Sequence, residues 1–196
     1  MTAGYGHFKT IKTEFIRKSI HFSIALSPLM AAWDRLFTLI FLMAGVLVYT
    51  LLEMMRIRGV TIPVISALTV QSSRPRDEGH FVPGPVTLGL GALLTILFYP
   101  PQTAAIAIYA LAFGDGFASL LGKPFGHIKP AFLSGKSLEG SIACFTAVFI
   151  ASWKVSGNTA VSLAAAITAS IIEAMPLEDL DNIAIPLTVA AVLSLF

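Results

Sequence analysis

The chain contains few charged residues for its length. Asp, Glu, Lys and Arg make up 12% of the 196 residues, whereas 56% are hydrophobic. A soluble domain usually carries about 25% charged residues, and the mean hydropathy of +0.81 departs from a soluble composition in the same direction. The charged residues are also clustered, which leaves long uncharged runs between them. This composition argues against a soluble domain and indicates a membrane protein.

Cysteine is nearly absent, and so are several motifs that would define other classes. The single cysteine, Cys144, cannot form a disulfide within the chain, and it leaves the redox compartment undetermined. No Cys/His cluster has the spacing of a zinc site, and no nucleic-acid-binding motif is present. The chain starts with the polar stretch MTAGYGHFKTIKTEF, and no small-residue cleavage site closes a short apolar core. We therefore expect no cleavable signal peptide.

Seven apolar runs dominate the rest of the sequence. They cover residues 14–33, 36–55, 83–99, 102–121, 138–153, 158–175 and 182–196. A helix needs about 20 residues to cross a bilayer, so most of the runs approach this length, and the seventh is short. Pro28 predicts a kink within the first run. Because no internal repeat or linker divides the chain, the sequence predicts one all-α domain, residues 1–196, folded as a polytopic transmembrane bundle of about seven spans.

The basic residues predict how this bundle is oriented. With seven spans and a cytoplasmic N-terminus, all 13 Lys and Arg residues except Arg35 and Lys154 fall on the cytoplasmic side, as the positive-inside rule requires. The acidic residues fall on the same side, apart from Asp34. A face that carries both signs at several helix ends suits a metal-bound, negatively charged soluble substrate. Small size and short loops favour the cytoplasmic membrane of a bacterium or archaeon, with the site facing the cytoplasm.

One stretch, AFGDGFASLLGKPFGHIKPAFLSGKSLEG at residues 112–140, combines an acid inside an apolar run with lysines and glycines. The acid is Asp115, and an ionisable residue at the edge of a span is a functional candidate by default. Contacts between small residues of neighbouring helices explain the glycines but not the acid. A carboxylate binds Mg²⁺, lysines neutralise phosphate oxygens, and glycines let backbone N–H groups approach them. The stretch therefore predicts a site for a magnesium-bound phosphate.

The segment Gly135–Gly140, GKSLEG, closes this stretch and opens the fifth apolar run. Lys136 is positioned to bind phosphate as a point charge, and the helix N-terminus adds N–H donors. The letters GKS resemble the end of a Walker A loop, but that motif requires a glycine where Pro130 stands. We therefore reject a P-loop.

Three smaller clusters have both a structural and a functional interpretation. Glu14, Arg17, Lys18 and His21 lie on one helix face. Snorkelling basic residues at a membrane entry would explain the cations, but not a histidine one turn deeper. Glu53 lies three residues before Arg56, and an ion pair within the helix is its structural explanation. Asp181–Asn182 is either a helix N-cap or, with Glu173, a set of oxygen ligands for a second metal or a nucleotide ribose. We expect the remaining histidines to be surface residues.

Four separated motifs occur in order: E-x2-RK-x2-H, GD-x2-A-x3-G-x3-G, GKS-x-EG and E-x7-DN-x3-P. Together they run from Glu14 to Pro186, most of the chain. This pattern resembles the dolichol kinase, phytol kinase and yeast-type CTP-dependent diacylglycerol kinase family of integral membrane proteins. The resemblance implies transfer of the γ-phosphoryl group of a nucleoside triphosphate, often CTP, to the hydroxyl of a lipid alcohol such as a polyprenol, phytol or diacylglycerol. The implied partners are the nucleotide, the lipid and the membrane, and a homo-oligomer is left open.

The resemblance and the residue types together give a predicted site. Its catalytic candidates are Asp115, His21, Lys136 and Glu139, with either Asp115 or His21 as the general base. Its nucleotide-binding candidates are Arg17, Lys18, Gly114, Gly122, Gly126, Gly135, Lys136, Ser137 and Asn182. The predicted Mg²⁺ ligands are Asp115, Glu139, Glu173 and Asp181.

Other membrane proteins fit the sequence less well. CDP-alcohol phosphotransferases need an Asp where Ala112 stands and an Arg where Ser119 stands. Phosphatidate cytidylyltransferase is the alternative enzyme, although its Lys-Asp and terminal Asp-Arg-x-Asp signatures are missing. A transporter would place ionisable residues near the bilayer midplane and on both sides, whereas here they gather at one face.

Overall fold

The computed structural model describes residues 17–60, 79–130, 133 and 135–196. The described residues form helices, 3₁₀ and π turns and connecting loops, without any strand, which confirms the all-α prediction. From residue 17 onward, every predicted apolar run coincides with helical structure. Glu14, Arg74 and Arg76 lie outside the described residues.

The helical elements follow one another closely along the chain. Residues 17–23 are helical, and after them come η1 (Ile24–Leu26), α2 (Ser27–Trp33), α3 (Arg35–Ile57), α5 (Gly84–Phe98), α6 (Pro101–Tyr109), η3 (Ala110–Asp115), α7 (Gly116–Phe125), α8 (Leu138–Ser156), α9 (Thr159–Ala174) and α10 (Asp181–Leu193). The elements α6, η3 and α7 join into one helical rod, Pro101–Phe125.

Three of these helices are long and apolar enough to cross a membrane: Arg35–Ile57, Pro101–Phe125 and Leu138–Ser156. The helices Gly84–Phe98, Thr159–Ala174 and Asp181–Leu193 are apolar but shorter. Large apolar side chains such as Phe41, Leu47 and Ile150 are more than half exposed on the outside of the bundle. A surface of this kind suits lipid rather than water, as expected for an integral membrane protein.

The first apolar run is interrupted where Pro28 predicts a kink. The 3₁₀ turn Ile24–Leu26 separates the preceding helix from α2, in which Pro28 occupies the first turn. A proline ring clashes with the carbonyl four residues earlier and supplies no N–H to it. That carbonyl belongs to Ile24, and the Ser27 hydroxyl donates to it at 2.8 Å instead.

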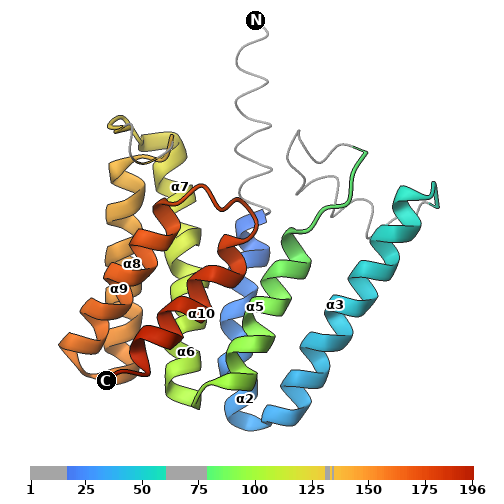
Figure 1. Ribbon diagram of the computed structural model, residues 1–196, viewed down its shortest axis with the longest axis horizontal. Helices are drawn as coiled ribbons and strands as arrows, with labels where there is room; N and C mark the ends of the chain where they lie inside the picture. Colours follow the sequence, from blue (N-terminus) through green and yellow to red (C-terminus); the bar gives the residue numbers. More distant parts are fainter. Residues whose placement is uncertain (1–16, 61–78, 131–132, 134) are drawn as a thin grey trace, which may run out of the picture.

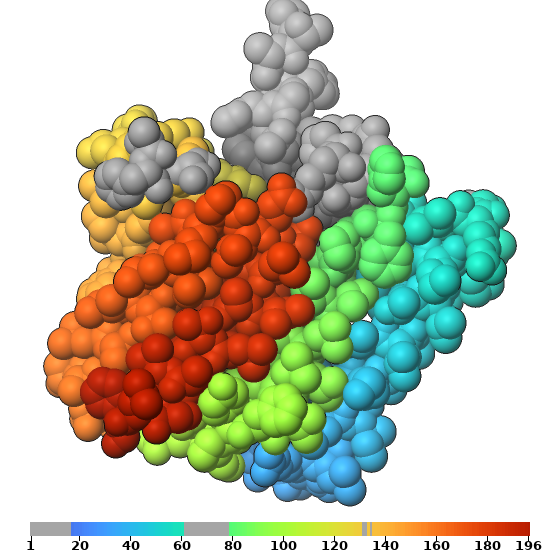
Figure 2. Space-filling view, viewed as in Figure 1, coloured from blue at the N-terminus to red at the C-terminus, as the bar shows by residue number. Residues whose placement is uncertain are grey.

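The core consists largely of small residues between α6, η3, α8, α9 and α10. Ala107, Ala110, Ala165, Ala166 and Ala169 are fully buried there. Small side chains let helix backbones approach closely, as is common in membrane bundles. In Figures 1 and 2, α10 lies between α9 and α5, and α3 lies at the outer edge against α5.

The polar ends of the helices gather at one end of the bundle. In Figure 1 the start of the helix at residue 17, the ends of α3, α7 and α9, and the starts of α5, α8 and α10 all lie toward the top. The turns that follow α2, α5 and α8 lie at the opposite end, with the C-terminus. The predicted site residues therefore come from segments that share one end.

Glu53 and Arg56 attach the end of α3 to the segment that leads into α5. Two nitrogens of Arg56 donate to the Glu53 carboxylate at 2.8 and 2.7 Å, which confirms the predicted ion pair. Glu53 is fully buried and also accepts a hydrogen bond from Val82 N at 3.0 Å, and Arg56 donates to His80 O at 2.8 Å. This pair is structural, and it fixes the backbone of residues 80–82.

Gly91 sets the distance between α5 and α10. A Cβ at Gly91 would lie 2.1 Å from the backbone oxygen of Asn182, whereas a Cβ at Gly45 in α3 would meet nothing within 4 Å. We expect Gly91→Ala to destabilise the fold by about 3 kcal/mol, since backbone adapts poorly to overpacking. Gly45→Ala should be neutral or stabilising, because alanine is the better helix former. Thermal unfolding in detergent checks the pair, and equal melting temperatures would contradict the packing of α5 on α10.

Candidate active site

Asp115 ends the π-helical segment η3 within the rod formed by α6, η3 and α7. It is 5% exposed. Single π turns inside α-helices frequently occur at functional sites. The next residue, Gly116, lets the first helix approach, because a Cβ there would lie 2.7 Å from the ring of Phe22. This close packing brings the helix at residues 17–23 against Asp115.

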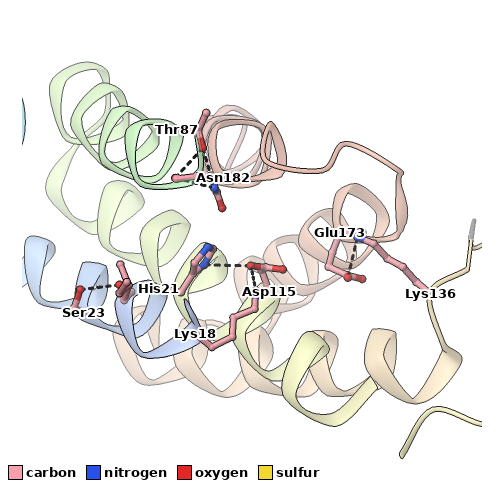
Figure 3. A network of polar contacts seen from close by, with 10 residues as sticks. Lys18, His21, Ser23, Thr87, Asp115, Lys136, Glu173 and Asn182 are labelled. Atoms are coloured by element: carbon pink, nitrogen blue, oxygen red, sulfur yellow. Dashed lines mark hydrogen bonds and ion pairs between the residues drawn. The ribbon is translucent and has the colours of Figure 1, made fainter. Parts of the chain in front are cut away.

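Two side chains of the first helix converge on one carboxylate oxygen of Asp115. The ammonium of Lys18 donates a hydrogen bond to Oδ2, and Nδ1 of His21 lies 3.1 Å from the same atom (Figure 3). Lys18 is 2% exposed and His21 is 7% exposed. Removing such charges from water is costly, and a buried ion pair is weak evidence for stability. Asp115 also lines two cavities, so this buried pair is a candidate functional centre rather than only a structural contact.

A cavity of about 470 Å³ opens beside Asp115. Its walls carry both signs of charge: Arg17, Lys123, Lys129 and Lys136 on one hand, and Asp115, Glu173, Glu178 and Asp181 on the other. Ligand pockets usually have volumes of about 300–1,000 Å³. We call this space the charged cavity. Its size and charges suit a polyanion that arrives with a metal cation.

Lys136 joins the GKS segment to the end of α9. Its ammonium lies 3.0 Å from Oε1 of Glu173 and donates to the backbone oxygen of the same residue (Figure 3). The other carboxylate oxygen, Oε2, is buried and has no hydrogen-bond partner among the described residues. A buried oxygen of this kind ordinarily has a hydrogen-bond donor or a cation as its partner.

The GKSLEG segment packs against the end of α7 through glycines. Ser137 caps α8 by accepting from Gly140 N at 3.1 Å, and its hydroxyl lies 3.3 Å from Gly122 O. A Cβ at Gly126 would lie 2.2 Å from Gly122 O, so only glycine fits there. Gly135 has φ +89°, a backbone conformation that favours glycine. Gly122, Gly135 and Ser137 line the charged cavity.

Some predicted residues lie outside the cavity walls. Both carboxylate oxygens of Glu139 accept from the loop backbone, at 2.9 Å from His127 N and 3.1 and 3.3 Å from Ile128 N. At the start of α8 this side chain is directed to that loop and lines neither cavity. Gly114 is buried against α8, where a Cβ would lie 2.8 Å from Val148 Cγ2. Gly126 packs against Gly122 O and the side chain of Ser137.

A second, smaller cavity of about 40 Å³ lies on the other side of Asp115. We call it the small cavity. Ile20, Val82, Pro85 and Leu88 give it apolar walls. The two cavities share the lining residues Arg17, Asp115 and Asp181. Asp115 thus stands between the charged cavity and a smaller one, whose walls combine these four apolar residues with polar ones that include Lys18, His21, Asp179 and Asn182.

The structure adds residues that the sequence did not single out. Lys123, Lys129 and Glu178 line the charged cavity, and the only signal in the sequence was their charge, at positions within or between the motifs that the motifs leave unspecified. Thr87 contacts Asn182, whose Nδ2 donates to Thr87 Oγ1 at 2.9 Å. A threonine inside an apolar run gives no signal of such a role. Asn182 itself, predicted to bind nucleotide, lines the small cavity rather than the charged one.

The carboxylates of Glu173 and Asp181 suit a Mg²⁺ ion that binds together with a nucleotide. Within the described part of the chain, no three His, Cys, Asp or Glu side chains lie close enough to hold a metal ion by themselves. Mg²⁺ in kinases, however, uses one or two carboxylates and takes its other ligands from phosphates and water. The unpaired Oε2 of Glu173, in a wall shared with Asp181, meets that requirement.

Comparison with curated proteins finds relatives of the kind that the four motifs predict. The chain is 27% identical to CTP-dependent diacylglycerol kinase 1 of Saccharomyces cerevisiae, over 76% of this chain and 52% of that protein. It is 26% identical to probable phytol kinase 1 of Oryza sativa subsp. japonica (66% and 47%) and 29% identical to probable phytol kinase 3 of Glycine max (88% and 60%). The resemblance to this group of lipid kinases is thus confirmed.

The chain spans about half the length of the curated relatives it matches. No protein-family model matches the chain, and no solved structure matches it. The geometry of the two cavities therefore comes from this structure alone.

The buried pair of Lys18 and Asp115 gives a test of the site geometry. We expect Lys18→Met to destabilise the protein by about 3–5 kcal/mol, because it leaves a buried carboxylate without its ammonium. The double variant Lys18→Met/Asp115→Asn should recover much of this loss, since both members are then neutral. Unfolding in denaturant checks the series, with Lys154→Met at the opposite end of the bundle as the control. Additive effects of the two substitutions would contradict the ion pair.

Proposed function

We propose that the protein transfers the γ-phosphoryl group of CTP to the hydroxyl of a lipid alcohol, such as a polyprenol, phytol or diacylglycerol. One observation carries the proposal: Asp115, held by Lys18 and His21, borders both the charged cavity and the small, partly apolar one. A transfer between a polyanionic donor and an apolar acceptor needs that arrangement. The names of the relatives, a CTP-dependent diacylglycerol kinase and probable phytol kinases, support a lipid kinase.

The charged cavity is the proposed donor site. Phosphoryl transfer depends mainly on positioning and on neutralising the negative charge of the phosphates. Arg17, Lys123, Lys129 and Lys136 line this cavity, and they would bind the triphosphate oxygens. Glu173 and Asp181 would hold Mg²⁺, which neutralises phosphate charge when bound.

The other two predicted metal ligands take different roles in this proposal. Glu139 uses both oxygens to hold the loop at residues 127–128. On Glu173, Lys136 contacts one carboxylate oxygen and the other is buried without a hydrogen-bond partner among the described residues. On Asp115, Lys18 and His21 both contact the same oxygen. We therefore assign Asp115 to the acceptor hydroxyl rather than to the metal.

Asp115 is the proposed general base. It lines both cavities, whereas His21 lines only the small one. In Figure 3 one oxygen of Asp115 faces Lys18 and His21, and the other points away from them, toward Glu173. The hydroxyl proton passes to Asp115 as the alcohol oxygen bonds to the γ-phosphorus. The bond from that phosphorus to the β-phosphate oxygen breaks, and CDP leaves. Lys18 and His21 keep the carboxylate in place.

We further propose that the helices span the cytoplasmic membrane as a bundle of about seven spans, with the N-terminus and both cavities at the cytoplasmic side. Lys and Arg concentrate at the end of the bundle where the cavities lie, which the positive-inside rule favours. A lipid alcohol would then reach the site laterally from the bilayer.

A transfer assay tests the proposed function directly. Purified protein in detergent receives γ-labelled CTP, ATP or UTP with Mg²⁺ and one lipid alcohol at a time. We expect label in a lipid with CTP as the preferred donor. Transfer of a cytidylyl group to phosphatidate, without label in any alcohol, would replace the proposal with a cytidylyltransferase. Substrate flux across vesicles without any transfer would replace it with a transporter.

Asp115→Asn should lower kcat by at least about 100-fold, because the amide cannot accept the hydroxyl proton. Asp34→Asn is the matched control. Asp34 caps α3 at the opposite end by accepting from Phe37 N at 2.9 Å, and asparagine caps equally well. Label transfer under saturating substrates measures both variants. Near-wild-type turnover in Asp115→Asn would contradict its role as base.

Lys136→Met should raise the KM for CTP by about tenfold or more, because a charged contact to phosphate is lost. The KM for the lipid should stay the same, since Lys136 does not line the small cavity. Lys154→Met removes a lysine from the other end of the bundle and should change neither constant. A rise in the lipid KM alone would contradict the assignment of the two cavities.

A further inference from the structure

The small cavity contains an acceptor atom that lacks a donor. Asn182 is the second residue of α10 and is 2% exposed. Its Oδ1 is buried and has no hydrogen-bond partner among the described residues. Leaving such an atom without a partner costs about 1–3 kcal/mol. A buried acceptor kept at this cost in a cavity wall indicates that a donor occupies the cavity during function.

The orientation of the Asn182 amide follows from its other contacts. Nδ2 donates to Thr87 Oγ1 at 2.9 Å and to the backbone oxygen of Gly84 at 3.3 Å. A backbone oxygen can only accept, so the nitrogen must face α5. Figure 3 shows the result: the nitrogen faces Thr87, and Oδ1 points away from it, toward the side of His21 and Asp115.

We propose that Oδ1 of Asn182 binds the hydroxyl of the acceptor lipid and that the small cavity is the acceptor site. This inference rests on the proposed function and adds to it the place and the contact of the acceptor. The hydroxyl donates to Oδ1 when the lipid binds. Rotation about its C–O bond then turns the same O–H toward Asp115, which lines the same cavity.

Size and wall chemistry favour this occupant over a nucleotide. The cavity holds about 40 Å³. Its walls combine the apolar residues Ile20, Val82, Pro85 and Leu88 with the polar residues Arg17, Lys18, His21, Asp115, Asp179, Asp181 and Asn182. A hydroxymethyl group fits this volume, whereas a nucleoside does not. The apolar walls match the carbons next to the hydroxyl. The cavity therefore suits the end of a primary alcohol whose chain stays in the bilayer.

The proposed hydrogen bond from the lipid hydroxyl to Asn182 is made in the bound ground state. Substitutions at Asn182 and at Asp115 should therefore change different kinetic constants. Loss of a contact that is made in the ground state and given up before the transition state raises KM and does not lower kcat. Asn182→Leu should therefore raise the lipid KM about tenfold without lowering kcat, and it should change the KM for CTP little. Asp115→Asn should do the opposite and lower kcat.

Deoxygenated analogues test the hydrogen bond itself. In mixed micelles we compare phytol with phytene, and 1,2-dioctanoylglycerol with its 3-deoxy analogue, as substrate and competitive inhibitor. A site built to bind a hydroxyl rejects the analogue that lacks it, so wild type should bind the analogue about tenfold more weakly than the alcohol. In Asn182→Leu the two should bind alike. If the variant still discriminates as wild type does, the proposal is overturned.

Thr87→Val is the control for a purely structural role of Asn182. The substitution removes one acceptor of Nδ2, but Thr87 does not line the small cavity and the Gly84 carbonyl still holds the amide. We expect Thr87→Val to keep the preference for the alcohol. Equal loss of that preference in Thr87→Val and Asn182→Leu would assign Asn182 to helix packing and overturn the proposal.

Gly84→Val tests the cavity while keeping both the asparagine and the backbone oxygen at residue 84 to which its Nδ2 donates, and it serves if Asn182→Leu does not fold. A Cβ at Gly84 would meet only Asp179 Oδ1, in the same cavity wall, at an ordinary 3.6 Å. The added side chain should narrow the cavity and raise the lipid KM about tenfold or more, with the KM for CTP unchanged. Gly45→Val, in open space on α3, is the matched control and should change neither constant.

The outcomes separate this inference from the proposed function. If wild type labels no lipid alcohol, both fail. If wild type is a lipid kinase but Asn182→Leu raises the KM for CTP alone, the asparagine belongs to the nucleotide site and only the inference fails. A lipid KM unchanged in both Asn182→Leu and Gly84→Val would likewise overturn the acceptor site while the kinase activity stands.

Discussion

The ion pair between Lys18 and Asp115 is the interaction on which the rest of this structure depends. Both groups are buried at the polar end of an otherwise apolar bundle. Two opposite charges tolerate burial only if their positions are fixed and further polar contacts support them. The π turn before Asp115, the glycine after it and the ring of Phe22 packed on that glycine all bring the first helix and the rod to the required distance.

The two cavities follow from the same constraint. The first helix packs against the end of η3, and its residue Arg17 lines both cavities. Near α7 and α8, the charged cavity lies between the GKSLEG segment and the end of α9. Near α5, the start of α10 packs closely, and the small cavity there has room for only a few atoms. One carboxylate, that of Asp115, therefore borders two cavities of different size and polarity.

The sequence predicts the helices and the chemical centre better than the geometry around them. Apolar runs and turn residues mark the helices, and an acid inside a span marks Asp115, because both signals are local in the chain. The spacing of Lys18 and His21 indicates a shared helix face, but periodicity does not say which helix that face meets. Glu139 shows this limit: its motif predicts a role at the nucleotide, whereas the fold turns its carboxylate to the backbone of a loop. Asn182 shows it again, since the direction of its amide depends on the backbone oxygen of Gly84, far away in the chain.

The link between α3 and the small cavity has a mechanical consequence. Glu53 and Arg56 bind the backbone of residues 80 and 82, and Val82 is part of the cavity wall. Most apolar side chains of α3 face the outside of the bundle, because only Thr38, Leu42 and Glu53 of this helix are buried. Tilting of this helix in response to bilayer thickness would thus be transmitted to Val82 through two side chains. In the proposed reaction the membrane supplies the acceptor, and through α3 it would also be in mechanical contact with the wall of the small cavity.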